Sequence, residues 1–223
     1  MPELLPLPPG FKGFDPHKHL RIYTRHLPHW RQDGATYFVT FRLGDSLPES
    51  KIDELKTLRA HWEYTHPQPW TDEAWRGYAR EVMRRSEAWL DEGHGACYFQ
   101  QQRWINDMND RLQHFNGVRY QLSCSVIMPN HCHVVIRPYD GYELEDLLGA
   151  MKGVNARNIN AAIGKQGEIW EQECYDRIIR DGAHLYRVIQ YIGRNPAASA
   201  KPKEKWPCWI EPGWVQAGWG FES

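Results

Sequence analysis

The chain has 223 residues, and its 41% hydrophobic content is enough to build the core of one domain with additions. The formal net charge is only −1, so nucleic-acid binding would have to rest on local patches rather than on overall charge. No apolar run is long enough to span a membrane, the start of the chain lacks a secretion signal, and the five cysteines show no metal-binding spacing. We expect a cytoplasmic protein with free thiols and no membrane partner.

The first part of the chain predicts an arm, a strand and two helices. Residues 1–34 are rich in proline and lack helical or strand periodicity, which indicates an extended arm. Alternating apolar residues over 37–43 predict the first strand. Helical spacing predicts a helix over about 48–64, and a proline-rich break separates it from a second helix. We interpret residues 67–94, which contain this second helix, as an insertion.

The remaining elements alternate between helices and strands. We expect a short strand over 96–99, a helix over 104–115, a strand pair over 119–137, a helix over 144–163, an extended segment over 168–180 and a helix over 185–195. The last helix should end at Asn195, because Pro196 disfavours helical geometry in the residue before it. This order, with its antiparallel strand pair, favours an α+β fold in which helices cover one sheet.

The end of the chain is rich in tryptophan. Of the 11 tryptophans, several lie in residues 201–223, which we expect to form a tail packed over the domain. Such a composition predicts either aromatic-rich packing or surfaces that stack on bases. The expected organisation is therefore an arm over 1–34, a main domain over 35–200 and this tail.

The strand pair carries the first functional signal. A three-residue loop over 128–130 would place Ser125 opposite His133 and give the pair one apolar and one polar face. In that register His131 and His133 point from the polar face, with their Cα atoms about 6.6 Å apart. Two neutral imidazoles placed in this way can share one divalent ion.

The final helix offers a third ligand and a nucleophile. Tyr191 and Asn195 are four residues apart, so they lie on one helix face about one turn from each other. If that face lies over the polar side of the strand pair, the Asn195 carboxamide oxygen could complete a metal site beside the Tyr191 hydroxyl. Metal-dependent phosphoryl transfer uses such a nucleophile. Taken alone, Tyr191 is more often a half-buried packing tyrosine and Asn195 a helix C-cap.

Together these motifs resemble a known family. The run Met128-Pro129-Asn130-His131-Cys132-His133, followed by Tyr191-Ile192-Gly193-Arg194-Asn195-Pro196, is similar to the HUH single-tyrosine transposases, and more narrowly to the REP-associated tyrosine transposases. The resemblance extends to residues 26–43, 169–171 and 205–207, so it spans most of the chain. Two departures exist: no basic residue follows Asn195-Pro196, and the 67–94 insertion is longer than in the smallest members.

The resemblance implies a fold, a cofactor and a substrate. The fold would be a ferredoxin-like (RRM-like) antiparallel sheet, and His131, His133 and Asn195 would hold Mg²⁺ or Mn²⁺. Tyr191 would cleave and rejoin single-stranded DNA at a hairpin through a 5′-phosphotyrosine. The protein would act as a monomer or homodimer. Candidate phosphate contacts are Arg137, Lys152, Arg157, Arg177 and Arg180.

Other readings stay open at this point. The chain could be a DNA-hairpin-binding regulator that keeps the fold but has little transposition activity. A phosphohydrolase with three alternating histidines would need a third histidine where Val135 stands. A structural zinc site would need Cys124 or Cys132, and strand alternation predicts that both lie on the face opposite the histidines. Tyr175 and Tyr186 are rival nucleophiles.

Overall fold

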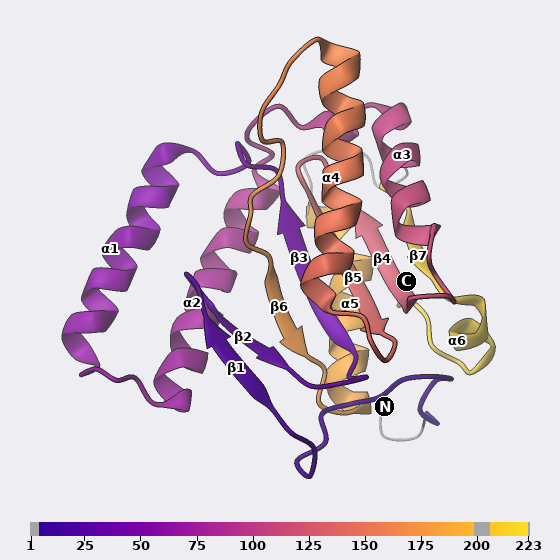
Figure 1. The fold of residues 1–223 in the computed structure, drawn as a ribbon, viewed down its shortest axis with the longest axis horizontal. Helices are drawn as coiled ribbons and strands as arrows, with labels where there is room; N and C mark the ends of the chain where they lie inside the picture. Colours follow the sequence, from indigo (N-terminus) through magenta and orange to yellow (C-terminus); the bar gives the residue numbers. More distant parts are fainter. Residues whose placement is uncertain (1–4, 199–205, 223) are drawn as a thin grey trace.

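The computed structural model describes residues 5–198 and 206–222, and within them the chain forms an α+β fold around one antiparallel sheet (Figure 1). Five strands lie in the order β6-β3-β5-β4-β7, and every neighbouring pair is antiparallel. The strands are β3 (Tyr37–Arg42), β4 (Tyr120–Ile127), β5 (His131–Pro138), β6 (Tyr175–Ile178) and β7 (Cys208–Ile210). The predicted fold class and sheet type are confirmed.

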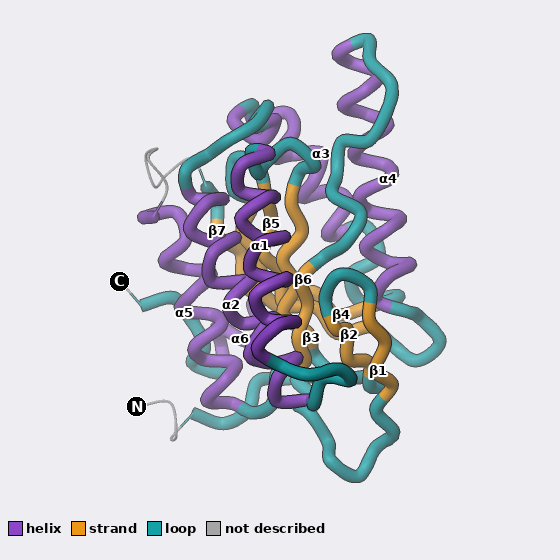
Figure 2. The backbone as a smooth tube through the Cα atoms, turned by 90° about the vertical axis from the view of Figure 1, so that its left-hand side faces the viewer, coloured by secondary structure: helices purple, strands orange, loops and turns teal. Residues whose placement is uncertain are grey.

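Helices cover both faces of this sheet (Figure 2). One face packs against α3 (Gln102–Gln113) and α4 (Leu144–Ile163), and the other packs against α5 (Gly182–Ala198). As a result the central strand β5 is buried on both sides, including its two histidines. Of the helices in the described residues, none is long and apolar enough to cross a bilayer.

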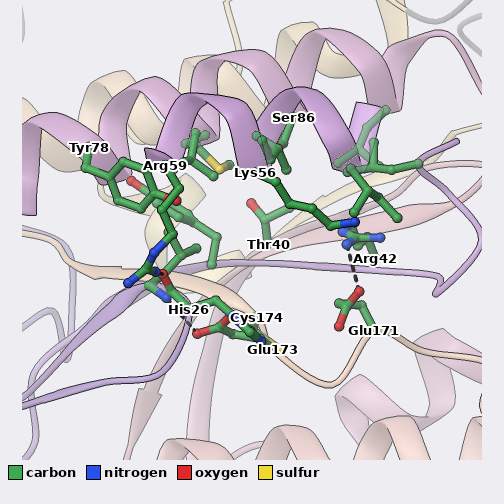
Figure 3. A pocket seen from close by; sticks show the side chains of 18 residues that line it. His26, Thr40, Arg42, Lys56, Arg59, Tyr78, Ser86, Glu171, Glu173 and Cys174 are labelled. Carbon is green, nitrogen blue, oxygen red and sulfur yellow. Dashed lines mark hydrogen bonds and ion pairs between the residues drawn. The ribbon is translucent and has the colours of Figure 1, made fainter. Parts of the chain in front are cut away.

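Two further helices form a layer beside α5. They are α1 (Glu49–Thr65), which begins and ends within one residue of its predicted range, and α2 (Asp72–Asp91), which lies within the predicted insertion 67–94. They pack on each other through an apolar cluster of their own that includes Leu58, Tyr78 and Val82. Between these helices and the β3 and β6 strands lies a cavity of about 330 Å³ (Figure 3).

Two predicted elements differ from the structure. Residues 98–100 form a 3₁₀ turn instead of a strand, in which Gln100 N donates to Cys97 O and Gln101 N donates to Tyr98 O. Helix α5 continues through Pro196 to Ala198 instead of ending at Asn195. Proline lacks the N–H that would bond the carbonyl four residues earlier. That carbonyl, Ile192 O, instead accepts from the Cys208 thiol at 3.6 Å.

The β4–β5 turn is shorter than predicted. Met128 N donates to His131 O at 2.8 Å, so only Pro129 and Asn130 span the turn. Val126, and not Ser125, is therefore the partner of His133. The predicted register was wrong by one residue next to the turn.

A β-bulge restores the expected pairing farther from the turn. The register shifts between Leu122 and Cys124, after which Leu122 lies opposite Ile136, as the predicted register requires. Between the bulge and the turn, however, the faces of β4 are exchanged. Cys124 lies opposite Val135, on the face of the histidines, whereas Ser125 lies on the other face. The prediction that Cys124 faces away from the histidines was therefore wrong.

Residues 5–34 contain a hairpin that the sequence did not indicate. Strands β1 (Arg21–Thr24) and β2 (Pro28–Arg31) pair antiparallel as a separate two-stranded sheet. The side chains that β2 buries are those of His29 and Arg31, so no apolar alternation marks this strand. The prediction of an extended arm without regular structure was therefore wrong for residues 21–24 and 28–31.

The C-terminal residues pack against both the sheet and the start of the chain. Strand β7 adds to the edge of β4, and the short helix α6 (Pro212–Gln216) follows it. Trp214 and Trp219 are buried, and their indole N–H groups donate to Pro9 O and Pro6 O at 2.9 and 2.8 Å. Aromatic-rich packing therefore accounts for these two tryptophans. The division into arm, domain and tail stays a prediction.

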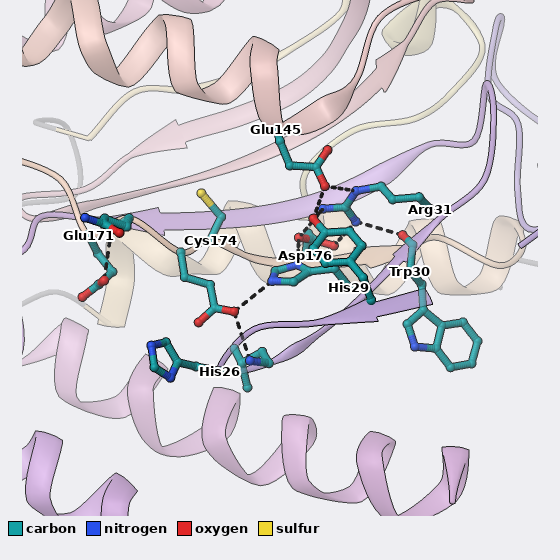
Figure 4. A network of polar contacts seen from close by, with 12 residues as sticks. His26, His29, Trp30, Arg31, Glu145, Glu171, Cys174 and Asp176 are labelled. Atoms are coloured by element: carbon teal, nitrogen blue, oxygen red, sulfur yellow. Dashed lines mark hydrogen bonds and ion pairs between the residues drawn. The ribbon is translucent and has the colours of Figure 1, made fainter. Parts of the chain in front are cut away.

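A buried network of charges joins the β1–β2 hairpin to the sheet (Figure 4). The Arg31 guanidinium donates two hydrogen bonds to the Asp176 carboxylate, at 2.5 and 2.9 Å. His29 bonds Asp176 at 2.6 Å through Nδ1 and Glu173 at 2.9 Å through Nε2. Arg31 also donates to Glu145 of α4 at 2.8 Å. Opposite charges thus compensate one another where water is excluded.

This network predicts a pH-dependent stability. Burial alone would lower the pKa of His29, but hydrogen bonds with Asp176 and Glu173 raise it from 6.5 to about 9. The stabilisation should be fully present below pH 6.5 and be lost as the pH rises through 9, by up to about 3 kcal/mol. Urea unfolding between these pH values measures it. The His29→Gln variant should show a flatter profile, and an identical slope in both proteins would contradict the assignment.

Candidate functional site

The two histidines of β5 form the centre of the candidate site. Their Nε2 atoms lie 3.1 Å apart, and both side chains are buried. Each Nδ1 atom is hydrogen-bonded to a neighbouring oxygen. The partner of His131 Nδ1 is Asn130 Oδ1 at 2.9 Å, and the partner of His133 Nδ1 is Thr40 Oγ1 at 2.7 Å. Because Asn130 Nδ2 donates to His94 O, its Oδ1 must accept from His131. The lone pair of His131 therefore lies on Nε2, facing His133.

Both imidazoles are neutral at physiological pH. Burial lowers the pKa of His131 to about 4. Burial, together with the neighbouring His131, lowers the pKa of His133 well below its ordinary value. The Asn195 side chain opposes both shifts, which places its amide beside the two rings. A neutral imidazole with a free Nε2 lone pair is the form that binds metal ions.

Helix α5 brings two more side chains to the same place. The Tyr191 hydroxyl lies 3.4 Å from His133 Nε2, and the two rings meet edge to face at 5.1 Å. Asn195 is buried one turn farther along the helix, and its Oδ1 makes no hydrogen bond to the described residues. The structure thus gathers Tyr191, Asn195, His131 and His133. An orphaned buried oxygen beside two imidazole nitrogens fits the ligand set of a divalent ion.

Helix α2 contributes a residue that the sequence did not indicate. Burial raises the pKa of Tyr191, and the negative charge of Glu87 on α2 raises it further. Glu87 is also hydrogen-bonded to Tyr191, which partly offsets the burial that raises its own pKa. Asp91, one turn farther on, has its pKa raised to about 6 by burial. Glu87 lies in the predicted insertion, far from any motif, so no sequence pattern marked it.

Comparison with known proteins identifies the segment that carries this site. Residues 101–195 match the family described as "Transposase IS200 like". This part of the chain is similar to the IS200-like transposases. The IS200-like segment extends from α3 to Asn195 in α5, and it therefore contains both histidines and Tyr191.

The comparisons with curated proteins and with solved structures do not narrow this family match further. No curated protein matches the chain. One solved structure, titled a REP-associated tyrosine transposase bound to a REP hairpin, aligns with 78% of this chain and 72% of its own, at 14% identity and a TM-score of 0.36.

One of the predicted phosphate contacts, Arg177, lies near the histidine pair, and Arg180 acts on the same residue, His184, as Arg177 does. Arg177 is exposed, and its guanidinium lies 5.2 Å from the centre of the Phe38 ring, which stacks on His133. Arg180 is also exposed. Burial lowers the pKa of His184 to about 4, and the charges of Arg177, Arg180 and Arg187 contribute to this shift. These three arginines therefore form a basic cluster, of which the sequence analysis missed Arg187.

The structure places the other three predicted contacts elsewhere. Arg137 donates to Gln121 at 3.2 Å, at the end of β5 away from the histidines. Lys152 is buried, and its ammonium donates to two backbone carbonyls, Glu171 O and Gln172 O. Arg157 is exposed on α4, which covers the opposite face of the sheet. None of these three lies beside the histidine pair.

A structural zinc site does not form here. Within residues 5–198 and 206–222, no three His, Cys, Asp or Glu side chains are placed to hold a metal ion. Cys132 faces away from the histidines, and Cys124 is on their face but opposite Val135. The ligand set available to the IS200-like segment is therefore two imidazoles and the Asn195 amide.

Proposed function

We propose that the protein is a metal-dependent single-stranded DNA endonuclease and strand transferase of the REP-associated HUH type, acting at DNA hairpins through a 5′-phosphotyrosine. The observation that carries this proposal is the meeting of the Tyr191 hydroxyl and the Asn195 amide with the Nε2 atoms of His131 and His133. Their position inside an IS200-like segment supports it.

The ligand set fits Mg²⁺ or Mn²⁺, with His131, His133 and Asn195 as the protein ligands. A bound divalent ion would neutralise charge that develops on the phosphate oxygens. The chain prepares the ligands in advance, because Thr40 and Asn130 hold the Nδ1 atoms and leave the Nε2 atoms facing each other. Burial keeps both rings neutral, so neither carries a positive charge that would repel an ion.

Tyr191 is the proposed nucleophile. Its oxygen forms a bond to phosphorus, the bond from phosphorus to the 3′ oxygen breaks, and the phenol proton is lost while the leaving 3′ oxygen is protonated. Attack by a 3′-hydroxyl on the phosphotyrosine reverses these changes and joins strands. The contacts of Tyr191 with His133 and Glu87 hold the hydroxyl in place for in-line attack.

The proposed partner is single-stranded DNA that folds into a hairpin. The cluster of Arg177, Arg180 and Arg187 is the candidate surface for its phosphates, since all three are exposed on the side of α5 and β6. We retain Arg137, Lys152 and Arg157 only as weaker candidates, because none of them lies beside the histidine pair. Binding through so few cations should weaken as salt rises.

The proposal includes a ferredoxin-like core. The chain order β3, helices, β4, β5, α4, β6 supports it, as does the spatial order β6-β3-β5-β4 of these strands. Strand β7 then extends the sheet at one edge, and α1 and α2 are added between β3 and α3.

The test is covalent capture of DNA. Labelled hairpin oligonucleotides with unpaired flanks, incubated with the protein and Mn²⁺, should give an adduct that survives denaturing electrophoresis and disappears with a chelator. Peptide mass spectrometry should place the phosphodiester on Tyr191. Cleavage without an adduct, or an adduct on Tyr175 or Tyr186, would contradict the proposal. Hairpin binding without any cleavage would favour the regulator reading.

A further inference from the structure

The cavity under helices α1 and α2 is lined by residues that include side chains of these two helices and of strand β3 (Figure 3). Its volume of about 330 Å³ is within the range of small-molecule sites, about 300 to 1,000 Å³. Apolar side chains form much of its wall, and they include Leu47, Ile52, Leu55, Val82, Met83 and Leu90. A cavity of this size and polarity fits a flat organic group.

The cavity and the histidine pair share a wall. Thr40 lines the cavity, and its hydroxyl also holds His133 Nδ1 at 2.7 Å. Arg42, which lies opposite His131 in the sheet, lines the cavity as well. The cavity and the His133 ring therefore lie on either side of the Thr40 side chain.

Aromatic rings and cations line part of the cavity, together with the carboxylates of Glu171 and Glu173. Tyr78 and Tyr175 contribute rings to its lining, and the Arg59 guanidinium lies 5.9 Å from the centre of the Tyr78 ring. Lys56 and Arg59 on α1 supply positive charge. Lys56 pairs with Asp53 in an exposed contact that competes weakly with a ligand, whereas Arg59 pairs with Glu63 and also donates to His26 O at 3.2 Å. Aromatic rings with flexible cations are the groups that proteins use to bind unpaired nucleotides.

We propose that this cavity holds one unpaired nucleotide of the DNA strand next to the scissile phosphate, with its base among the apolar side chains and Tyr78 and its phosphate toward Lys56 and Arg59. The inference rests on the proposed function and deepens it, because it names the part of the substrate that the cavity selects. Most of the cavity wall comes from residues 26–90, which precede the IS200-like segment. Selection of this nucleotide would therefore be a property added by α1 and α2.

A filled cavity provides the test. Ser86 lines the cavity from α2, and the Ser86→Trp variant should fill much of it. Ala88, on the same helix, is exposed and does not line the cavity, so Ala88→Trp is the matched control. Affinity is measured in a Tyr191→Phe background by fluorescence anisotropy. The probes are hairpin oligonucleotides with an unpaired flank, each carrying one abasic position in turn. Thermal melting confirms that both variants fold.

We expect that the Ala88→Trp protein binds the probe with one particular abasic position about tenfold or more weakly than it binds intact DNA. The Ser86→Trp protein should bind intact DNA about that much more weakly and lose nothing further at this position. Equal abasic penalties in both proteins, or no sensitive position, would overturn the cavity assignment while hairpin binding and adduct formation stand. Failure of both proteins and of the wild type to bind any hairpin would overturn the proposed function itself.

Discussion

The Tyr191→Phe variant is expected to form no covalent adduct with hairpin DNA, a loss of at least about a thousandfold in cleavage rate. Phenylalanine keeps the ring that packs edge to face on His133 and on Phe38, but it removes the oxygen that would bond to phosphorus. The measurement is adduct formation over time with labelled hairpin DNA and Mn²⁺, for the variant and the wild type at equal concentration.

The same helix offers a control. Tyr186 also lies on α5, but its hydroxyl bonds Glu222 near the end of the chain and not the histidines. The Tyr186→Phe variant should therefore keep the cleavage rate of the wild type. Both variants should retain hairpin affinity, because neither removes a positive charge. An adduct that persists in Tyr191→Phe and vanishes in Tyr186→Phe would move the nucleophile and break the argument from geometry.

The candidate site could be reached from the sequence because its spacing is local. His131 and His133 are two residues apart on one strand, and Tyr191 and Asn195 are four apart on one helix. Strand and helix periodicity alone puts each pair on one face. Which faces meet required the fold, and the α+β class with helices over an antiparallel sheet followed from the order of elements.

Long-range and polar features could not be reached in the same way. The exchanged faces of β4 depend on a bulge between Leu122 and Cys124, and no residue type there announces one. The β1–β2 hairpin buries His29 and Arg31, which read as surface residues until their acidic partners are known. Glu87 reaches Tyr191 only because α2 folds back beside α5. In each case a contact distant in sequence overrides the local pattern.

The Asp176→Asn variant is expected to lose about 3 to 5 kcal/mol of unfolding free energy at neutral pH. Hydrogen bonds with His29 and Arg31 hold the pKa of Asp176 below its usual range even though burial opposes them, so the carboxylate is charged. The amide has nearly the same shape but no charge, and it would leave Arg31 and the protonated His29 buried without their shared counter-ion. Urea unfolding at constant pH measures the loss.

The ion pair of Arg21 and Glu143 serves as a control for Asp176→Asn, because the distance between two charges alone does not determine how much their pair stabilises the fold. Their contact is 2.5 Å long, the same as the shorter Arg31–Asp176 contact, but both side chains are about half exposed, at 53% and 52%, against 7% and 1%. Water and salt screen an exposed pair, so Glu143→Gln should change stability far less than Asp176→Asn does. Similar losses in the two variants would mean that the network around Asp176 is not what fastens the hairpin to the sheet. A large loss in Asp176→Asn alone would show that burial, which leaves the remaining charges unsolvated, makes this contact matter.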